Sequence, residues 1–157
     1  MEFYLNLSSY RIVDLSPLIN LTNLANLHLS NNQIVELDPL ATLNKLKNLV
    51  LSSYQIIDLS PLSKLANLSS LSLTNNKKVD LRPLSKLTDL KTLQLSSNQI
   101  VDLGPIRNLT ILRLLHLSNN QLVDLSPLAS FKLLTLVDLS KNRNVHLAPL
   151  SDMNKFS

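Results

Sequence analysis

Six carboxylates recur along this chain at one spacing. Every twenty-second residue from position 14 carries one, and a histidine takes the seventh position: Asp14, Glu36, Asp58, Asp80, Asp102, Asp124 and His146. Carboxylates held side by side are the groups of general acid–base catalysis and of calcium binding. No second column of oxygen ligands accompanies them, and each precedes a predicted helical turn, where a carboxylate accepts backbone N–H bonds. We therefore interpret this acidic column as a structural ladder, and we expect no enzyme, no cofactor and no metal site.

Two tyrosines interrupt a second column that is otherwise asparagine. The asparagines are Asn32, Asn76, Asn98, Asn120 and Asn142. An asparagine amide satisfies backbone groups inside a turn, whereas the phenols of Tyr10 and Tyr54 are too large for an inward slot. Two repeats separate them, which is about 10 Å at sheet spacing, and such a pair would be a recognition anchor. The interpretation we favour is that each ring packs over its neighbours and seals an irregular turn.

The elements that position these columns follow from the repeat itself. The pattern Leu-x-Leu begins at residues 5, 27, 49, 71, 93 and 115, and Val137 begins a seventh unit. This period-two start indicates a short strand, and the spacing of three between the later leucines indicates a 3₁₀ or single-turn α segment. Ser16-Pro17 and Ser60-Pro61 are typical of an N-cap followed by proline. The seven prolines share one column: Pro17, Pro39, Pro61, Pro83, Pro105, Pro127 and Pro149.

One such unit buries too little apolar surface to fold alone, so neighbouring units must stack. The sequence therefore predicts an α/β fold: a right-handed solenoid with a seven-strand parallel sheet on its concave face and short 3₁₀/α returns on its convex face. Residues 1–157 form one domain without conventional capping domains.

Side chains that point outward from the strands are the candidate binding residues. They are Asn6, His28, Val50, Ser72, Gln94, His116 and Asp138, and the column two residues later is serine or threonine throughout. This face is small, polar and without aromatic anchors, which suits a scaffold surface more than a tight binding site. His28 and His116 are four repeats apart, too far to share a metal. We expect partner binding at Tyr10, Tyr54, His28, Val50, Gln94, His116 and Asp138.

Composition excludes several other functions. The 157 residues include no cysteine, which removes disulfides, thiol catalysis and cysteine-based zinc sites. Apolar residues are always interrupted, so no membrane span is expected, and the N-terminus shows no signal peptide. The net charge of +4 reflects lysines and arginines in the returns and in the turns before the strands, a basic flank that could touch phosphate. No glycine-rich phosphate loop or RNA-binding signature accompanies it, so we expect no nucleic-acid partner.

Two apolar features remain open. The ninth residue of every unit is β-branched, as in Val13, Val35 and Val101. We favour a second short strand whose apolar side is covered, and the alternative is an exposed ridge that serves as an association surface. A solenoid also needs its ends covered. We expect at least one end to be poorly sealed, which predicts that the chain is a fragment or that it self-associates end to end.

The motif LxLSxNxIxDLxPLxxLxxLxx resembles the internalin-type leucine-rich repeat over residues 5–157. The class also includes a regulator of a protein phosphatase, but the proline column, as in Asp58-Leu59-Ser60-Pro61-Leu62, looks more like bacterial internalins. The resemblance implies a non-catalytic protein-interaction scaffold, at the bacterial surface or secreted. The alternatives are a cytoplasmic regulatory subunit that docks on an enzyme such as a phosphatase, and a structural repeat with no evolved partner. The chain departs from the class in lacking a helical N-terminal cap.

Overall fold

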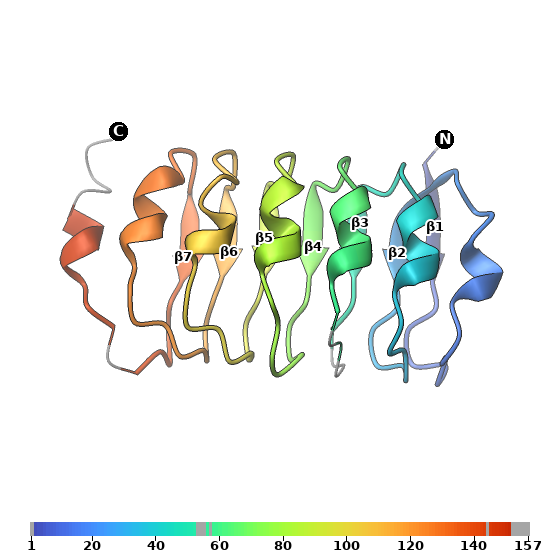
Figure 1. Cartoon of the computed structure of the whole chain (residues 1–157), viewed down its shortest axis with the longest axis horizontal. Helices are drawn as coiled ribbons and strands as arrows, with labels where there is room; N and C mark the ends of the chain where they lie inside the picture. Colours follow the sequence, from blue (N-terminus) through green and yellow to red (C-terminus); the bar gives the residue numbers. More distant parts are fainter. Residues whose placement is uncertain (1, 53–55, 57, 144, 152–157) are drawn as a thin grey trace.

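The strands of the computed structural model lie side by side in one parallel sheet, in chain order (Figure 1). The model describes residues 2–52, 56, 58–143 and 145–151. Each strand pairs with the next at an offset of one repeat, so that Leu49 lies between Leu27 and Leu71. The strands are β1 (Phe3–Asn6), β2 (Leu24–His28), β3 (Asn48–Val50), β4 (Ser70–Ser72), β5 (Thr92–Gln94), β6 (Leu114–His116) and β7 (Leu136–Asp138).

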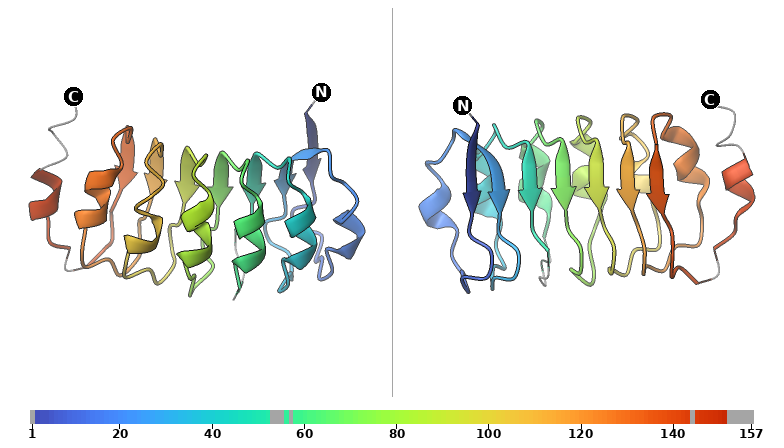
Figure 2. Two further views of the ribbon diagram at one scale, coloured as in Figure 1. Left: turned by 45° about the horizontal axis from the view of Figure 1, so that its top comes forward. Right: turned by 180° about the vertical axis from the view of Figure 1, so that it is seen from behind.

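The returns between strands are short 3₁₀ helices that line the opposite side of the molecule (Figure 2). Each has proline at its first or second position, where the fixed φ of proline suits a helix start. The described part of the chain contains no α-helix, so the returns take the tighter of the two predicted forms. They are η1 (Ser16–Leu18), η2 (Asp38–Thr42), η3 (Ser60–Lys64), η4 (Arg82–Lys86), η5 (Gly104–Ile106) and η6 (Ser126–Ser130).

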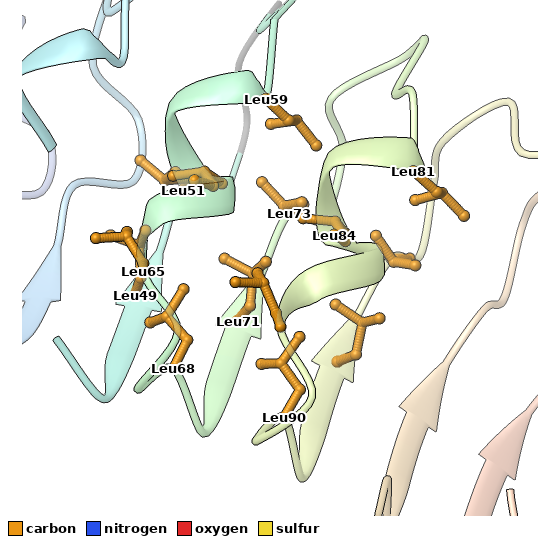
Figure 3. Close-up of a cluster of buried hydrophobic side chains, with 14 of the residues drawn as sticks. Leu49, Leu51, Leu59, Leu65, Leu68, Leu71, Leu73, Leu81, Leu84 and Leu90 are labelled. Carbon is orange, nitrogen blue, oxygen red and sulfur yellow. The ribbon is translucent and has the colours of Figure 1, made fainter. Parts of the chain in front are cut away.

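The core is a stack of leucine layers between the sheet and the 3₁₀ helices (Figure 3). In one layer Leu71 of β4 and Leu73 just after that strand point inward and meet Leu84 from η4 (Figure 3), and all three are fully buried. Because each layer packs on the layers of both neighbouring repeats, burial is shared along the solenoid. The fold predicted from the 22-residue period is confirmed.

The asparagine column joins consecutive repeats by hydrogen bonds, as expected. Asn98 is buried, and its Nδ2 donates to the carbonyl of Leu95 at 2.8 Å and to that of Leu73 in the preceding repeat at 3.1 Å. Its Oδ1 accepts the backbone N–H of Asn76 at 2.8 Å. Asn32, Asn120 and Asn142 donate in the same way to their own repeat and to the one before.

Candidate functional site

The exposed face of the sheet brings the predicted strand residues into one row. Strand pairing sets His28 beside Val50, and sets His116 between Gln94 and Asp138. Strands β3, β4 and β5 separate His28 from His116, as the repeat spacing predicted. No group of three metal-ligating side chains occurs among the described residues. The row contains two separate clusters of side chains, one at each end of the sheet.

The first cluster contains an aromatic residue that the sequence interpretation missed. Tyr4 of β1 lies against His28 with the ring centroids 5.1 Å apart and the planes at 70°, and the Tyr4 hydroxyl is 3.3 Å from His28 Nδ1. The prediction that this face has no aromatic anchor was wrong. Tyr4 precedes Leu5 by one residue, so extending the in–out alternation of the strand by one position would have placed it on this face. Tyr4 and His28 form an edge-to-face pair. Val50 lies beside His28 on the next strand and completes this first cluster.

The second cluster is apolar on one side and charged on the other. Leu114 pairs with Leu136 across β6 and β7, and both lie one position before the inward leucine column. Beside them, His116 pairs with Asp138. Hydrogen bonds from Ser140 lower the pKa of the Asp138 carboxyl, and the neighbouring His116 adds to that shift. This end of the face therefore carries a carboxylate that stays ionised at neutral pH next to two leucines.

Of the tyrosines in the turns, Tyr10 is described and Tyr54 lies outside the described residues. The Tyr10 side chain is 71% exposed, so the favoured packing interpretation was wrong for this ring. The turn is bonded to the next repeat, because the backbone N–H groups of Tyr10 and Ile12 both donate to Asn32 Oδ1, and it is locally reshaped at Arg11, whose φ of 59° lies in the left-handed region. Because the ring is exposed, it is accessible to a partner, and the recognition role of Tyr10 stays a prediction.

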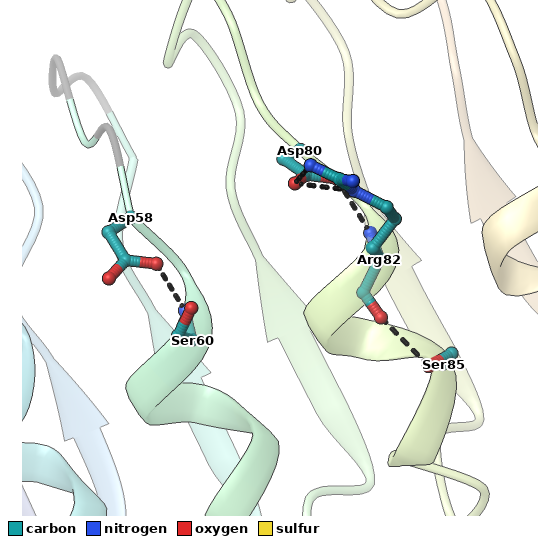
Figure 4. A network of polar contacts seen from close by, with 5 residues as sticks. All are labelled: Asp58, Ser60, Asp80, Arg82 and Ser85. Carbon is teal, nitrogen blue, oxygen red and sulfur yellow. Dashed lines mark hydrogen bonds and ion pairs between the residues drawn. The ribbon is translucent and has the colours of Figure 1, made fainter.

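The acidic column has the structural role that was expected of it. Five of its carboxylates accept the backbone N–H of the residue two positions later, at 2.7–3.0 Å: Asp14, Asp58, Asp80, Asp102 and Asp124. Figure 4 shows two of these bonds, and Asp80 also binds the Arg82 side chain. The serine N-caps were a wrong assignment, since Ser16 and Ser60 are the first residues of η1 and η3. The N-cap position of each helix is a leucine, and the aspartate before that leucine caps the helix from one position further out by accepting the N–H of the first helical residue.

These caps predict a pH dependence of stability. Hydrogen bonds from Ser16 and Ser126 lower the pKa of Asp14 and of Asp124. A lowered folded-state pKa stabilises the fold above the unfolded-state value, about 3.9 for aspartate, and this stabilisation is lost as the pH falls through the folded-state pKa. We expect the thermal midpoint, followed by circular dichroism, to fall below about pH 4. The variant Asp14→Asn/Asp124→Asn keeps acceptor oxygens that do not titrate, so its midpoint should fall less; an equal fall would contradict the assignment.

The ninth-column valines form an exposed ridge rather than a covered strand. Val13, Val35, Val101 and Val123, called here the valine ridge, are 50–60% exposed. The preceding column, with Ile34, Ile56, Ile100 and Leu122, is buried instead. Residues next to each other in an extended segment point to opposite sides, so an inward Ile34 leaves Val35 outside. In the fourth repeat an exposed Lys78 takes the isoleucine position, and there Val79 packs against the core.

The basic flank is spread over the returns and the turns before the strands. Lys45 donates to Asn23 Oδ1 at 2.7 Å, and Lys47 forms an ion pair with Glu2. Five further basic side chains are exposed: Lys64, Lys86, Lys91, Arg107 and Arg113.

Within the described residues, no helix is both long enough and apolar enough to cross a membrane.

The last leucine layer is only partly covered. Leu147 is 63% exposed, whereas the leucines of the same column in the preceding repeats are at most 3% exposed. Leu139 and Leu150 of this layer are half-buried, as are Leu5 and Leu7 in the first repeat. End-to-end self-association of this chain stays a prediction.

Comparison with known proteins places the chain among leucine-rich repeat proteins. Residues 22–64 and 88–130 match the family model described as leucine rich repeats in two copies. An internalin (inlF) from Listeria monocytogenes is similar with a TM-score of 0.82 and 31% identity, over 94% of this chain and 50% of that one. Internalin C2 from the same species has a TM-score of 0.75 and 38% identity, over 88% and 71%.

A leucine-rich repeat protein from Leptospira interrogans is similar with a TM-score of 0.80 and 30% identity, over 94% of this chain and 38% of that one. The chain thus spans half the length of inlF and less of the Leptospira protein. No curated protein matches the chain.

Proposed function

This chain belongs to the leucine-rich repeat family, in its internalin-like class, and from this premise we propose that it is a non-catalytic scaffold that binds another protein through the exposed face of its sheet. The observation that carries the proposal is the contact between Tyr4 and His28 on that face. Tyrosine offers a large contact area with little side-chain entropy to lose, and tyrosines are enriched among the residues that dominate binding energy.

The neighbouring residues on the face support this assignment. Val50 lies beside His28, and the polar side chains of Asn26 and Asn48 pair on the same strands. An apolar centre with hydrogen-bonding groups around it is the usual composition of a protein interface. The rest of the proposed contact is the second cluster, with Leu114, His116, Leu136 and Asp138 at the other end of the row.

A non-catalytic role is supported by how the candidate acids are used. Asp102 and Asp124 hold the starts of η5 and η6 through backbone bonds of 2.7 and 2.8 Å. Asp14, Asp58 and Asp80 make the same bond, so these five carboxylates act as local caps of the 3₁₀ helices. A general acid–base pair would instead need a carboxyl whose pKa is raised toward neutrality, whereas the shifts of Asp14, Asp58, Asp80 and Asp124 are downward.

The test is the affinity of the chain for a partner protein identified by proximity labelling and then purified. We expect Tyr4→Ser/His28→Ser to weaken binding about tenfold or more, because an aromatic anchor and its neighbour are removed. Tyr10→Ser is the matched control, since it removes an exposed tyrosine that lies outside the strands. Circular dichroism melts would confirm that all variants fold.

The outcomes separate the two candidate tyrosine sites. Loss of affinity with the Tyr4 and His28 variant alone supports the sheet face. Loss with Tyr10→Ser alone assigns binding to the turn and overturns the proposal, as does unchanged affinity in both variants. Loss of affinity in both to the same extent also overturns it, because the proposed contact would then have no specific role.

A further inference from the structure

A groove runs beside the valine ridge between the first two repeats. It is lined by Val13, Asp14, Leu15, Val35, Glu36 and Pro39, and its volume is about 350 Å³. Val13 and Val35 expose more than half of their surface there. This surface belongs to the turn after each strand, so it is separate from the sheet face that carries the proposed function.

The charge beside these valines is opposite to the charge of the chain. The net charge is +4, with 11 acidic residues in all, and more than half of these stand in the acidic column, next to the ninth-column residues. Two of them, Asp14 and Glu36, line the groove. The nearest basic residue along the chain, Arg11, precedes Val13 by two positions and does not line it.

The two carboxylates of the groove differ in what they already bind. Asp14 accepts the backbone N–H and the hydroxyl of Ser16 at 2.8 and 2.6 Å, and these bonds lower its pKa, so it is ionised at neutral pH. Glu36 has no hydrogen bond or ion pair within the described part of the chain, and it is exposed. Glu36 is therefore a carboxylate beside an apolar surface with its acceptor capacity unused.

Such a surface complements one kind of side chain. Lysine and arginine cover apolar surface with their aliphatic stems while the charged head reaches a polar group. A carboxylate partner for that head gives a charge-assisted hydrogen bond. We propose that this groove binds a basic segment of a partner polypeptide, with the stem of a lysine or arginine on Val13 and Val35 and its charged head at Glu36 and Asp14. This contact is independent of the sheet face.

The test uses the whole chain with ¹³C-labelled valine methyl groups and a synthetic peptide, acetyl-(Val-Lys)₄-amide, as the probe. We expect NMR shifts at Val13 and Val35 on titration, with Val50 on the sheet face unchanged. The peptide acetyl-(Val-Glu)₄-amide should produce no shifts at these methyls. Raising the salt from about 20 to 300 mM should lower the affinity for the lysine peptide several-fold, because salt screens charge pairs that are exposed to solvent.

Variants then locate the contact. Val35→Ser/Glu36→Gln should lower the affinity for the lysine peptide about tenfold, because the variant loses apolar contact and an exposed ion pair. The matched control is Val123→Ser/Asp124→Asn, the same two columns four repeats away, and its affinity should stay within about twofold of the parent. Because the substituted side chains are exposed, the melting temperatures should be similar.

Three results would overturn the proposal: shifts that are largest at Val50, equal binding of the two peptides, or equal loss of affinity in the two double variants. The first of these would support the sheet face instead, so the failure of this inference would be distinguishable from failure of the proposed function. Weakened binding by the Val35 and Glu36 variant alone would support the groove.

Discussion

Replacing Asn98 with alanine is expected to lower the free energy of unfolding by about 3 kcal/mol. The substitution removes the amide that donates to the carbonyls of Leu73 and Leu95 and that accepts the N–H of Asn76. These backbone groups are enclosed by the stacked turns, and each buried group left without a partner costs about 1–3 kcal/mol. Urea denaturation followed by circular dichroism would measure the change.

The control for this prediction is the same substitution in the last repeat. Asn142 also donates to two carbonyls, those of Leu117 and Leu139, at 2.9 Å. It is only half-buried, so solvent can replace its bonds and Asn142→Ala should cost about 1 kcal/mol. A cost for Asn98→Ala no greater than that for Asn142→Ala would contradict the role of burial in this ladder.

The repeat made most of this fold predictable. A single unit such as 93–114 shows an ambiguous short apolar run, but seven aligned units give seven observations of every column. The strands centred on Leu71 and Leu93, the proline positions and the inward asparagines all follow from that alignment. The structural role of the acidic column was predictable for the same reason, since a local cap needs only neighbouring residues.

The valine ridge was not predictable from residue type alone. A β-branched residue favours an extended backbone, and the backbone here does pair with the next repeat, as Gln33 N–H donates to the Ile12 carbonyl at 2.8 Å. Residue type does not say which side of that segment meets the core. The isoleucines of the preceding column are buried, so the valines face outward. Lys78 made the isoleucine column look less apolar than the valine column. The sequence interpretation therefore placed the valines, rather than the isoleucines, on the covered side.

The geometry of the turn after each strand was also missed. The fifth residue of six described repeats has φ between 57° and 64°, in the left-handed region: Ser9, Asn31, Asn75, Ser97, Asn119 and Lys141. Glycine and asparagine favour this region, and only three of the six residues are asparagine, with no glycine. The stacked turns therefore hold serine and lysine in a conformation that their own preferences do not indicate.

Replacing Leu71 with alanine is expected to lower the free energy of unfolding by about 3–5 kcal/mol. Leu71 lies at the centre of the sheet, in β4, with Leu49 and Leu93 on the neighbouring strands, and all three are fully buried. Truncation removes contacts to the layers on both sides and leaves a cavity between them. The change would again be measured by urea denaturation.

Leu136→Ala provides the matched control, because Leu136 is also a strand leucine but points outward from β7 and is exposed. Its truncation should cost less than about 1 kcal/mol. A second variant tests whether the layers act together: Leu71 and Leu93 line adjoining layers, so Leu71→Ala/Leu93→Ala should differ from the sum of the single changes by about 0.5 kcal/mol or more. Strict additivity would mean that each layer is stabilised separately, which contradicts the shared burial that a stacked repeat requires.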